Sequence, residues 1–157
     1  MAAKRSAGIL LYRFEDGAPR VLLVHPGGPY WTRRDLGAWT IPKGEYEDGE
    51  LARDCALREL GEELGAAAPD LEVEALLDLG AVRQKSGKVV EAWAAEGEFE
   101  PAQLASNTFK LEWPPHSGNE REFPEVDRAE WFDPEQARRK MLAAQVELLD
   151  RLLEHLE

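Results

Sequence analysis

Residues 44–66 read GEYEDGELARDCALRELGEELGA, and this stretch organises the interpretation of the whole chain. Its glycines and apolar spacing predict a turn from Gly44 to Gly49, followed by a helix that ends at Gly65. Near the end of this helix, three carboxylates share an arc of about 100° on a helical wheel. They are Glu59, Glu62 and Glu63.

The leucines of the same helix lie on a different side from these carboxylates. We therefore expect Leu57, Leu60 and Leu64 to be buried and the carboxylates to face outward. Glu59 and Glu63 form a pair of like charges four residues apart, which mildly destabilises an isolated helix. A divalent cation between them would reverse this penalty, because hard cations prefer carboxylate oxygens.

The composition is typical of a globular protein. The chain has 157 residues, of which 43% are hydrophobic and 32% are charged, so we expect one domain over residues 1–157. Its net charge of -12 argues against general binding to nucleic-acid backbones, which requires clustered Lys and Arg. The same charge repels phosphorylated small molecules, so such a substrate would need a bound metal or a local basic patch.

The chain has a single cysteine, Cys55, which excludes an internal disulfide and a cysteine-rich zinc site. Its position in the middle of the predicted helix favours a small buried residue. No apolar run approaches the roughly 18 residues of a membrane span. Met1–Arg5 is basic, but Ile9–Tyr12 is too short for the core of a signal peptide. A cytoplasmic protein without membrane contact is the expectation.

Alternating and continuous apolar runs predict strands on both sides of the helix, and thus an α/β or α+β fold in layers. The expected strands are Gly8–Phe14, Val21–His25, Trp39–Ile41, Leu71–Val82, Val89–Phe99, residues 107–113 and Ala129–Phe132. Gln84–Gly87 reads as a hairpin turn, and Pro101–Ser106 as a short helix or loop. Pro114–Pro124 is rich in Pro, Gly and polar residues and predicts a long loop. Asp133 is the expected N-cap of a closing helix with an apolar stripe.

A loop after the second strand contains interleaved aromatic and basic residues: Tyr30, Trp31, Arg33 and Arg34. Such a loop can stack a base and contact a phosphate. Alternatively, its aromatic rings pack on the domain and its arginines are solvated. The sequence leaves both interpretations open.

The organising stretch resembles the Nudix box of the Nudix hydrolases. Seven positions match at the family's spacing: Gly44, Glu50, Arg58, Glu59, Glu62, Glu63 and Gly65. Chance would produce this match about once in a million chains of this length. Two departures are minor. Ala66 is smaller than the usual aliphatic residue, and Gly61 costs about 1 kcal/mol of helix stability relative to Ala.

The resemblance implies an α/β/α sandwich with a mixed sheet. It also implies that Glu59 and Glu63 are the main ligands of Mg²⁺ or Mn²⁺, with Glu62 as a further ligand or as the group that polarises water. The backbone carbonyl of Lys43 would complete the metal site. Arg58 would pair with Glu50 or steer a catalytic carboxylate. The Lys43 side chain would contact a substrate phosphate, unless it is simply a solvated loop lysine.

In this family a further acidic residue from a loop outside the box often assists catalysis. The candidates are Glu120, Glu122 and Glu125, and nothing in the sequence chooses among them. We take Glu122 as the catalytic candidate. His116, in the same segment, is a weaker candidate for a general base.

The resemblance implies a metal-dependent pyrophosphohydrolase that cleaves a diphosphate linkage in a nucleoside diphosphate derivative. The segment Trp39–Gly44 resembles enzymes that act on diadenosine polyphosphates or nucleoside triphosphates. Gly80-Ala81 stands where ADP-ribose hydrolases carry a proline, which counts against that class. However, no tyrosine lies between Ala66 and Glu100, where hydrolases of dinucleoside polyphosphates usually have one. The alternative is a non-catalytic nucleotide-binding sensor or interaction module, which would not need an intact box.

Overall fold

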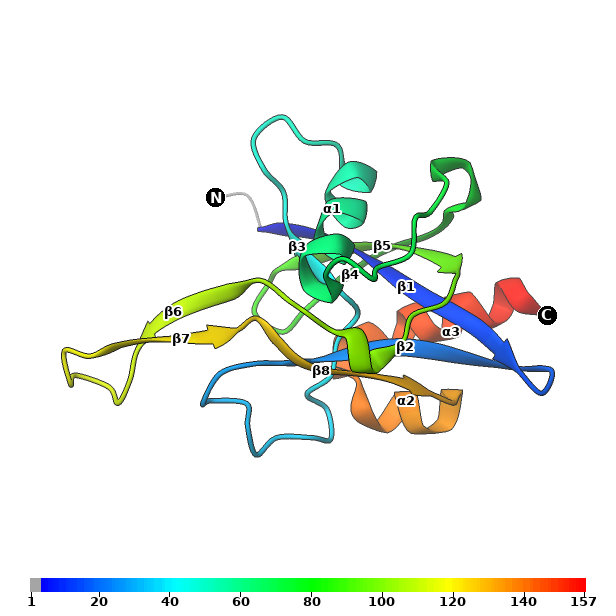
Figure 1. The fold of residues 1–157 in the computed structure, drawn as a ribbon. Helices are drawn as coiled ribbons and strands as arrows, with labels where there is room; N and C mark the ends of the chain where they lie inside the picture. The colour runs from blue at the N-terminus through cyan, green and yellow to red at the C-terminus, as the bar shows by residue number, and fades with distance from the viewer. Residues whose placement is uncertain (1–3) are drawn as a thin grey trace.

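The computed structural model describes residues 4–157, so the first three residues of the basic segment Met1–Arg5 lie outside it. The strands are β1 (Arg5–Glu15), β2 (Ala18–Pro26), β3 (Lys43–Glu45), β4 (Leu77–Arg83), β5 (Val89–Glu96), β6 (Thr108–Glu112), β7 (Glu120–Pro124) and β8 (Val126–Phe132) (Figure 1). The helices are α1 (Ala52–Leu64), α2 (Pro134–Lys140) and α3 (Val146–Leu156). Short 3-10 turns lie at Val73–Ala75, Pro101–Gln103 and Ala143–Gln145.

A mixed six-stranded sheet forms the centre of the molecule. Its strand order is β4-β5-β1-β2-β8, and the short β3 pairs with β1 outside this path. The β1–β5 pair is parallel, and the other pairs of this sheet are antiparallel. Helix α1 lies on one face of the sheet, and α2 and α3 lie on the other (Figure 1). This arrangement confirms the predicted α/β fold with a mixed sheet.

Strand β1 supplies side chains to both faces of the sheet, because successive residues of a strand point in opposite directions. Ile9 and Leu11 pack with Leu60 and Leu64 of α1. Leu10 belongs to the second cluster, which contains the fully buried Trp39 and the apolar residues of α3. The two clusters explain why the strand reads as an almost continuous apolar run.

Three predicted strands differ in extent from the observed ones. The segment Leu71–Val82 becomes a strand only from Leu77, because residues 73–75 form a 3-10 turn. Strand β5 ends at Glu96, just before Gly97, rather than at Phe99. Trp39–Ile41 makes only isolated bridges, from Thr40 to Val24 and from Trp39 to Met141. Pro42 follows directly and has no N–H to extend a ladder.

The prediction of a loop over Pro114–Pro124 was wrong for its second half. Residues 120–124 form β7, which pairs with β6 from Glu112↔Glu120 to Thr108↔Pro124. This two-stranded hairpin projects from the body of the molecule (Figure 1). Most residues of β7 are exposed, so the strand lacks the apolar alternation by which strands are recognised.

The closing helix begins as predicted but is divided in two. The carboxylate of Asp133 accepts a hydrogen bond of 2.8 Å from the backbone N–H of Gln136, as an N-cap does. Helix α2 then stops at Lys140, because the backbone N–H of Leu142 donates to the carbonyl of Trp39 at 2.8 Å. The apolar stripe of α3 is buried against the sheet, as expected.

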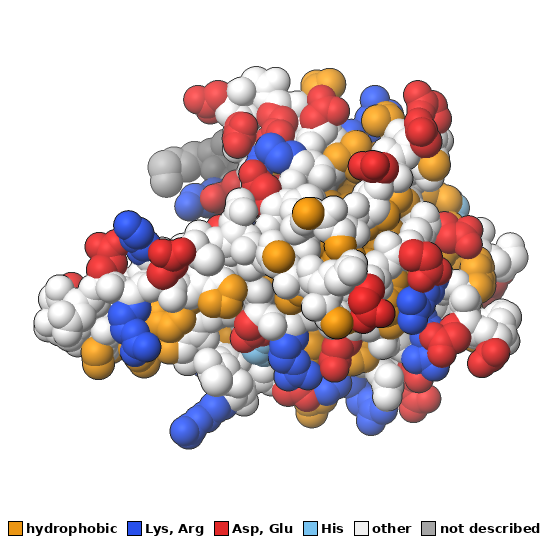
Figure 2. Space-filling model, viewed as in Figure 1, with side chains coloured by type: hydrophobic (Ala, Val, Ile, Leu, Met, Phe, Trp, Pro, Cys, Tyr) orange, Lys and Arg blue, Asp and Glu red, His pale blue; other side chains and the backbone are white. Residues whose placement is uncertain are grey.

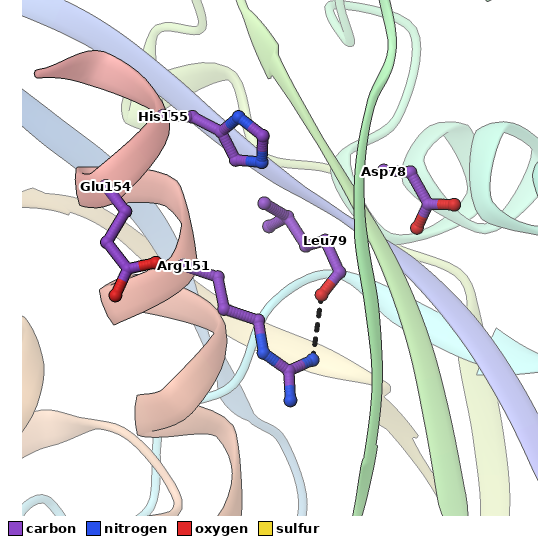
Figure 3. Close-up of a pocket in the computed structure, with 5 residues that line it drawn as sticks. All are labelled: Asp78, Leu79, Arg151, Glu154 and His155. Atoms are coloured by element: carbon purple, nitrogen blue, oxygen red, sulfur yellow. Dashed lines mark hydrogen bonds between the residues drawn. The ribbon is translucent and has the colours of Figure 1, made fainter.

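Arg151 of α3 ties this helix to β4 (Figure 3). Its Nη1 donates to the carbonyls of Leu79 at 2.8 Å and Ala81 at 3.1 Å, beside a cavity of about 280 Å³. Both carbonyls are backbone groups, so Arg151 supports the fold at this cavity. Among residues 4–157, no helix is long and apolar enough to span a membrane.

The N-cap of α2 provides a test of this description. We expect Asp133→Ala to lower the free energy of unfolding by about 1 kcal/mol, because the N–H of Gln136 loses its acceptor. Asp133→Asn keeps an oxygen acceptor and should stay within about 0.5 kcal/mol of the parent. Urea denaturation measures both values. Equal stability of the Ala and Asn variants would contradict the assignment of this cap.

Candidate active site

Arg58 connects helix α1 to the turn that precedes it. Its Nε and Nη2 donate to the two carboxylate oxygens of Glu50 at 2.8 and 2.9 Å, which is the paired geometry that guanidinium groups favour. Nη2 also donates to the carbonyl of Glu45 at 3.2 Å. Arg58 holds the pKa of Glu50 at about 2 and keeps this carboxylate charged. The pairing expected from the sequence is present.

The remaining Arg58 nitrogen reaches the acidic residues of the box. Nη1 donates to Oε1 of Glu59 at 2.8 Å and to Oε2 of Glu62 at 3.0 Å. Both alternatives for Arg58 therefore hold: one guanidinium group pairs with Glu50 and also orients two carboxylates. In this arrangement Arg58 positions Glu59 and Glu62, and its catalytic role stays a prediction.

The helical wheel predicted that Glu59 faces outward, and this prediction was wrong. Glu59 is only 9% exposed. Strand β3 crosses this part of α1, and a Cβ on Gly44 would lie 1.9 Å from Cδ of Glu59. A residue without a side chain is therefore required where the backbone of β3 passes over the carboxylate. The helix alone could not reveal this burial, because the covering strand pairs with β1.

Glu63 also lies against the backbone of β3. Its Oε1 accepts a hydrogen bond of 3.2 Å from the N–H of Lys43. Burial raises the pKa of Glu63 to about 8, although the neighbouring Lys43 lowers it, and burial also raises the pKa of Glu59. Two partly desolvated carboxylates side by side are a costly arrangement that a bound cation would relieve.

These groups line an open cleft of about 470 Å³. Its lining consists of Lys43, Gly44, Glu45, Glu47, Arg58, Glu59, Glu62, Glu63, Lys88 and Glu125. Acidic side chains gather around α1 and the turn before it, with basic side chains among them (Figure 2). The cleft thus combines several carboxylates with two lysines, in a chain whose net charge is -12.

The carboxylates suit a hard divalent cation. In each, the hydrogen bonds to Arg58 or to Lys43 N–H use one oxygen, and the other accepts no hydrogen bond from an N–H or O–H donor of residues 4–157. These free oxygens are Oε2 of Glu59, Oε1 of Glu62 and Oε2 of Glu63. Within residues 4–157 no three acidic, His or Cys side chains already converge on one point. The carboxylates of Glu59 and Glu62 lie side by side on Nη1 of Arg58, and a cation between them would relieve their repulsion.

The structure separates the acidic candidates outside the box. Glu122 lies on β7, where its carboxylate and the hydroxyl of Thr108 are hydrogen-bonded, and it does not line the cleft. Glu120 and His116 are likewise exposed on the projecting hairpin. Glu125 is the member of the group that lines the cleft. Glu122 therefore lies outside the cleft in this structure, and a catalytic role for it stays a prediction.

Lys88 also lines the cleft and was not predicted. It follows the turn between β4 and β5, and its Nζ lies 4.0 Å from Oε1 of Glu45. The turn carries no motif that singles out this lysine. The only available signal was a basic residue directly after the predicted turn Gln84–Gly87.

The aromatic and basic loop after β2 divides its residues between different neighbours. The ring of Tyr30 packs edge-on against Trp113, with centroids 5.3 Å apart, and Arg33 is exposed. The guanidinium of Arg34 lies 5.5 Å from the centroid of Trp31. Of these four residues, only Trp31 lines a second cavity, of about 550 Å³. This cavity is bounded by Pro26, Trp31, Thr40, Lys43, Gln84, Lys85, Ser86, Leu142, Ala143 and Ala144.

Lys43 borders both the acidic cleft and this second, largely apolar cavity. Its side chain is half-buried, and burial lowers the pKa of its amine. The site therefore has a charged part and an apolar part that meet at one lysine. Such a combination suits a ligand with an anionic group joined to a flat apolar one.

Two glycines of the box provide a matched test of this packing. We expect Gly44→Ala to lower the free energy of unfolding by about 1–2 kcal/mol, because the new Cβ displaces the Glu59 carboxylate from Arg58. Gly61→Ala should raise it by about 0.5–1 kcal/mol, because Gly61 lies in α1 with open space around it. Urea denaturation measures both. A Gly44→Ala protein as stable as the parent would contradict the close approach.

Comparisons with known proteins agree with this fold. A model of the NUDIX domain matches residues 2–152. An RNA pyrophosphohydrolase of Dinoroseobacter shibae is 44% identical over 70 residues, which are 45% of this chain and 39% of that protein. The match thus spans well under half the length of this curated relative.

Two solved structures share the fold over nearly the whole chain. A C. elegans Ap4A hydrolase in a binary complex aligns with a TM-score of 0.64 and 22% identity, covering 98% of each chain. The NUDIX domain of Shewanella oneidensis NrtR, complexed with ADP ribose, aligns with a TM-score of 0.65 and 19% identity, covering 100% of this chain and 90% of that one. At this identity the likeness concerns the fold alone. By the extent of the domain match, the chain belongs to the NUDIX family.

Proposed function

We propose that this protein is a metal-dependent pyrophosphohydrolase that cleaves a diphosphate linkage in a nucleoside diphosphate derivative. The observation that carries the proposal is the meeting of Glu59, Glu62 and Glu63 with two lysines in one cleft, beside an apolar cavity. The chain acts as one NUDIX domain over residues 1–157. Its relatives include an RNA pyrophosphohydrolase, which by its name acts on the same kind of bond.

Mg²⁺ or Mn²⁺ is the proposed cofactor. The free oxygens of Glu59, Glu62 and Glu63 would hold it, together with the backbone carbonyl of Lys43. When bound, the ion would neutralise charge on the phosphate oxygens and lower the pKa of a coordinated water. Arg58 restrains two of these carboxylates through Nη1, so it sets the directions from which they can turn toward an ion.

Other residues of the cleft would act on the substrate. Lys43 and Lys88 have amines at the cleft and would hold phosphate oxygens, which the acidic surroundings otherwise repel. Glu125 would accept a proton from the attacking water, since it enters the cleft from outside the box. The phosphorylated product then leaves through the open side of the cleft.

The apolar cavity supports a nucleoside as the other part of the substrate. Trp31 offers an aromatic surface there, and Lys43 stands between this cavity and the cleft. We propose diadenosine polyphosphates or nucleoside triphosphates as the substrate class. An Ap4A hydrolase shares the fold, which is compatible with this class.

A non-catalytic nucleotide-binding module is the competing interpretation. It would use the apolar cavity and the lysines in the same way, and it would not depend on the carboxylates for turnover. The three box glutamates and Arg58 weigh against it, because a cluster of partly buried acids is costly without a cation.

The carboxylate Glu63 tests the catalytic proposal. We expect Glu63→Gln to lower Mg²⁺-dependent hydrolysis by at least about a hundredfold, because the amide is a poor ligand for a hard cation. The measurement is release of phosphate or nucleoside monophosphate across a panel of nucleotides, with circular dichroism to verify folding. Unchanged turnover in the folded variant would refute the proposed mechanism. Nucleotide binding without turnover in the parent would favour the non-catalytic module.

Glu125 and Glu122 form a matched pair for the assisting acid. We expect Glu125→Gln to lower kcat by about a hundredfold or more, as loss of a general base does. Glu122→Gln makes the same chemical change on the projecting hairpin and should keep kcat within about twofold of the parent. Steady-state kinetics at saturating Mg²⁺ measures both. A larger loss in Glu122→Gln would mean that the hairpin carries the assisting acid.

A further inference from the structure

Part of the lining of the apolar cavity consists of polar side chains from the turn between β4 and β5. Gln84, Lys85 and Ser86 lie there, whereas Leu142, Ala143 and Ala144 form part of the apolar wall. The same turn leads directly to Lys88 in the acidic cleft. A nucleotide whose phosphates lie in the cleft and whose base enters the cavity would therefore place the base beside these polar side chains.

A buried glutamine fixes the orientation of the Gln84 amide. Gln145 is fully buried, and its side-chain oxygen accepts a hydrogen bond of 3.0 Å from the backbone N–H of Ile41. A backbone N–H can only donate, so this Gln145 atom must be the oxygen. The amide nitrogen of Gln145 then faces Gln84 and donates to its Oε1 at 3.3 Å.

The orientation of the Gln84 amide follows from the orientation of the Gln145 amide. If the Gln84 amide were turned over, two NH₂ groups would face each other and neither would find an acceptor. Oε1 of Gln84 is therefore held by Gln145, and its NH₂ group is left without a protein partner among residues 4–157. A half-buried donor pair at the wall of a cavity is available to a ligand that supplies an acceptor.

The nucleobases differ in what they offer to such donors. Guanine and hypoxanthine present a carbonyl oxygen at position 6 beside the N7 acceptor, whereas adenine presents an amino group at position 6. Opposite adenine, the NH₂ group of Gln84 would find the N7 acceptor but no acceptor at position 6, whereas guanine and hypoxanthine offer an acceptor at both positions. The aromatic surface of Trp31 also favours a purine, whose larger ring system stacks over more area.

We propose that Gln84 is a specificity-determining residue that donates to the 6-oxo group of a purine, and that Gln145 is the positioning residue that holds its amide. This inference rests on the proposed function for the placement of the phosphates. Of the two proposed substrate groups it favours the nucleoside triphosphates over the diadenosine polyphosphates, and among the triphosphates it selects guanosine and inosine nucleotides over adenosine nucleotides. The buried bond to Ile41 makes the preference a property of the folded core rather than of a mobile side chain.

Hydrolysis of GTP, ITP and ATP with Mg²⁺ tests the proposal, because ITP has the 6-oxo group but lacks the 2-amino group of GTP. We expect kcat/KM for GTP and ITP to exceed that for ATP by about tenfold or more, mainly through KM. Gln84→Glu replaces the donors with acceptors and should shift the preference toward ATP. Gln84→Leu should bring the three substrates to within about threefold of each other.

A matched control and a binding measurement complete the experiment. Gln103→Glu makes the same chemical change on an exposed turn and should leave the substrate ratios unchanged. Calorimetric titration with GMP, IMP and AMP reports base preference without turnover. Preference for ATP in the parent, or a GTP-to-ATP ratio unchanged in Gln84→Glu, would overturn the inference.

The same measurements separate this inference from the proposed function. Tighter binding of GMP and IMP than AMP, combined with no hydrolysis of any nucleotide, would overturn the proposed catalysis and support the role of Gln84. Hydrolysis of all three triphosphates at equal rates would support the proposed catalysis and overturn the role of Gln84. Absence of both binding and hydrolysis would overturn both proposals.

Discussion

The paired hydrogen bonds between Arg58 and Glu50 are the interaction on which the site depends. They join the turn of residues 44–49 to the middle of α1, and both side chains are largely shielded from water. The donors that Glu50 does not use are directed at Glu59 and Glu62. One guanidinium thus closes the turn and partly offsets the repulsion among the acids. A lysine could not replace it, because a single ammonium lacks the planar set of donors.

Strand β3 supplies the second constraint, because it brings a different part of the sheet over the same helix. Its pairing with β1 places Gly44 against Glu59, and it directs the N–H of Lys43 at Glu63. One oxygen of each carboxylate is therefore held by a hydrogen bond, from Arg58 to Glu59 and from the N–H of Lys43 to Glu63. The burial that makes these acids weaker is imposed by the sheet. The helix supplies their spacing, and the strand supplies their environment.

This division explains how much could be predicted from the sequence. Helix α1 and its end at Gly65 follow from local spacing, and they were predicted. The pairing of Arg58 with Glu50 was one of two roles that the resemblance to the Nudix box implied. The burial of Glu59 depends on strand β3, which is held over the helix by its pairing with β1. The helical wheel considers the helix alone and missed this burial. Strand β7 was missed because an exposed strand has no apolar alternation. Glu125 could not be chosen over Glu122 until the direction of the hairpin was known.

The turn between β4 and β5 shows why different parts of this chain would determine the reaction and the choice of substrate. Its last residue, Lys88, borders the acidic cleft, and its first, Gln84, borders the apolar cavity. The box specifies which groups meet a phosphate, since its chemistry requires particular residues at particular spacings. The turn connects two strands, and its side chains take no part in the hydrogen bonds of Arg58 to the carboxylates. Base preference can therefore change there without disturbing Arg58 or the carboxylates it holds.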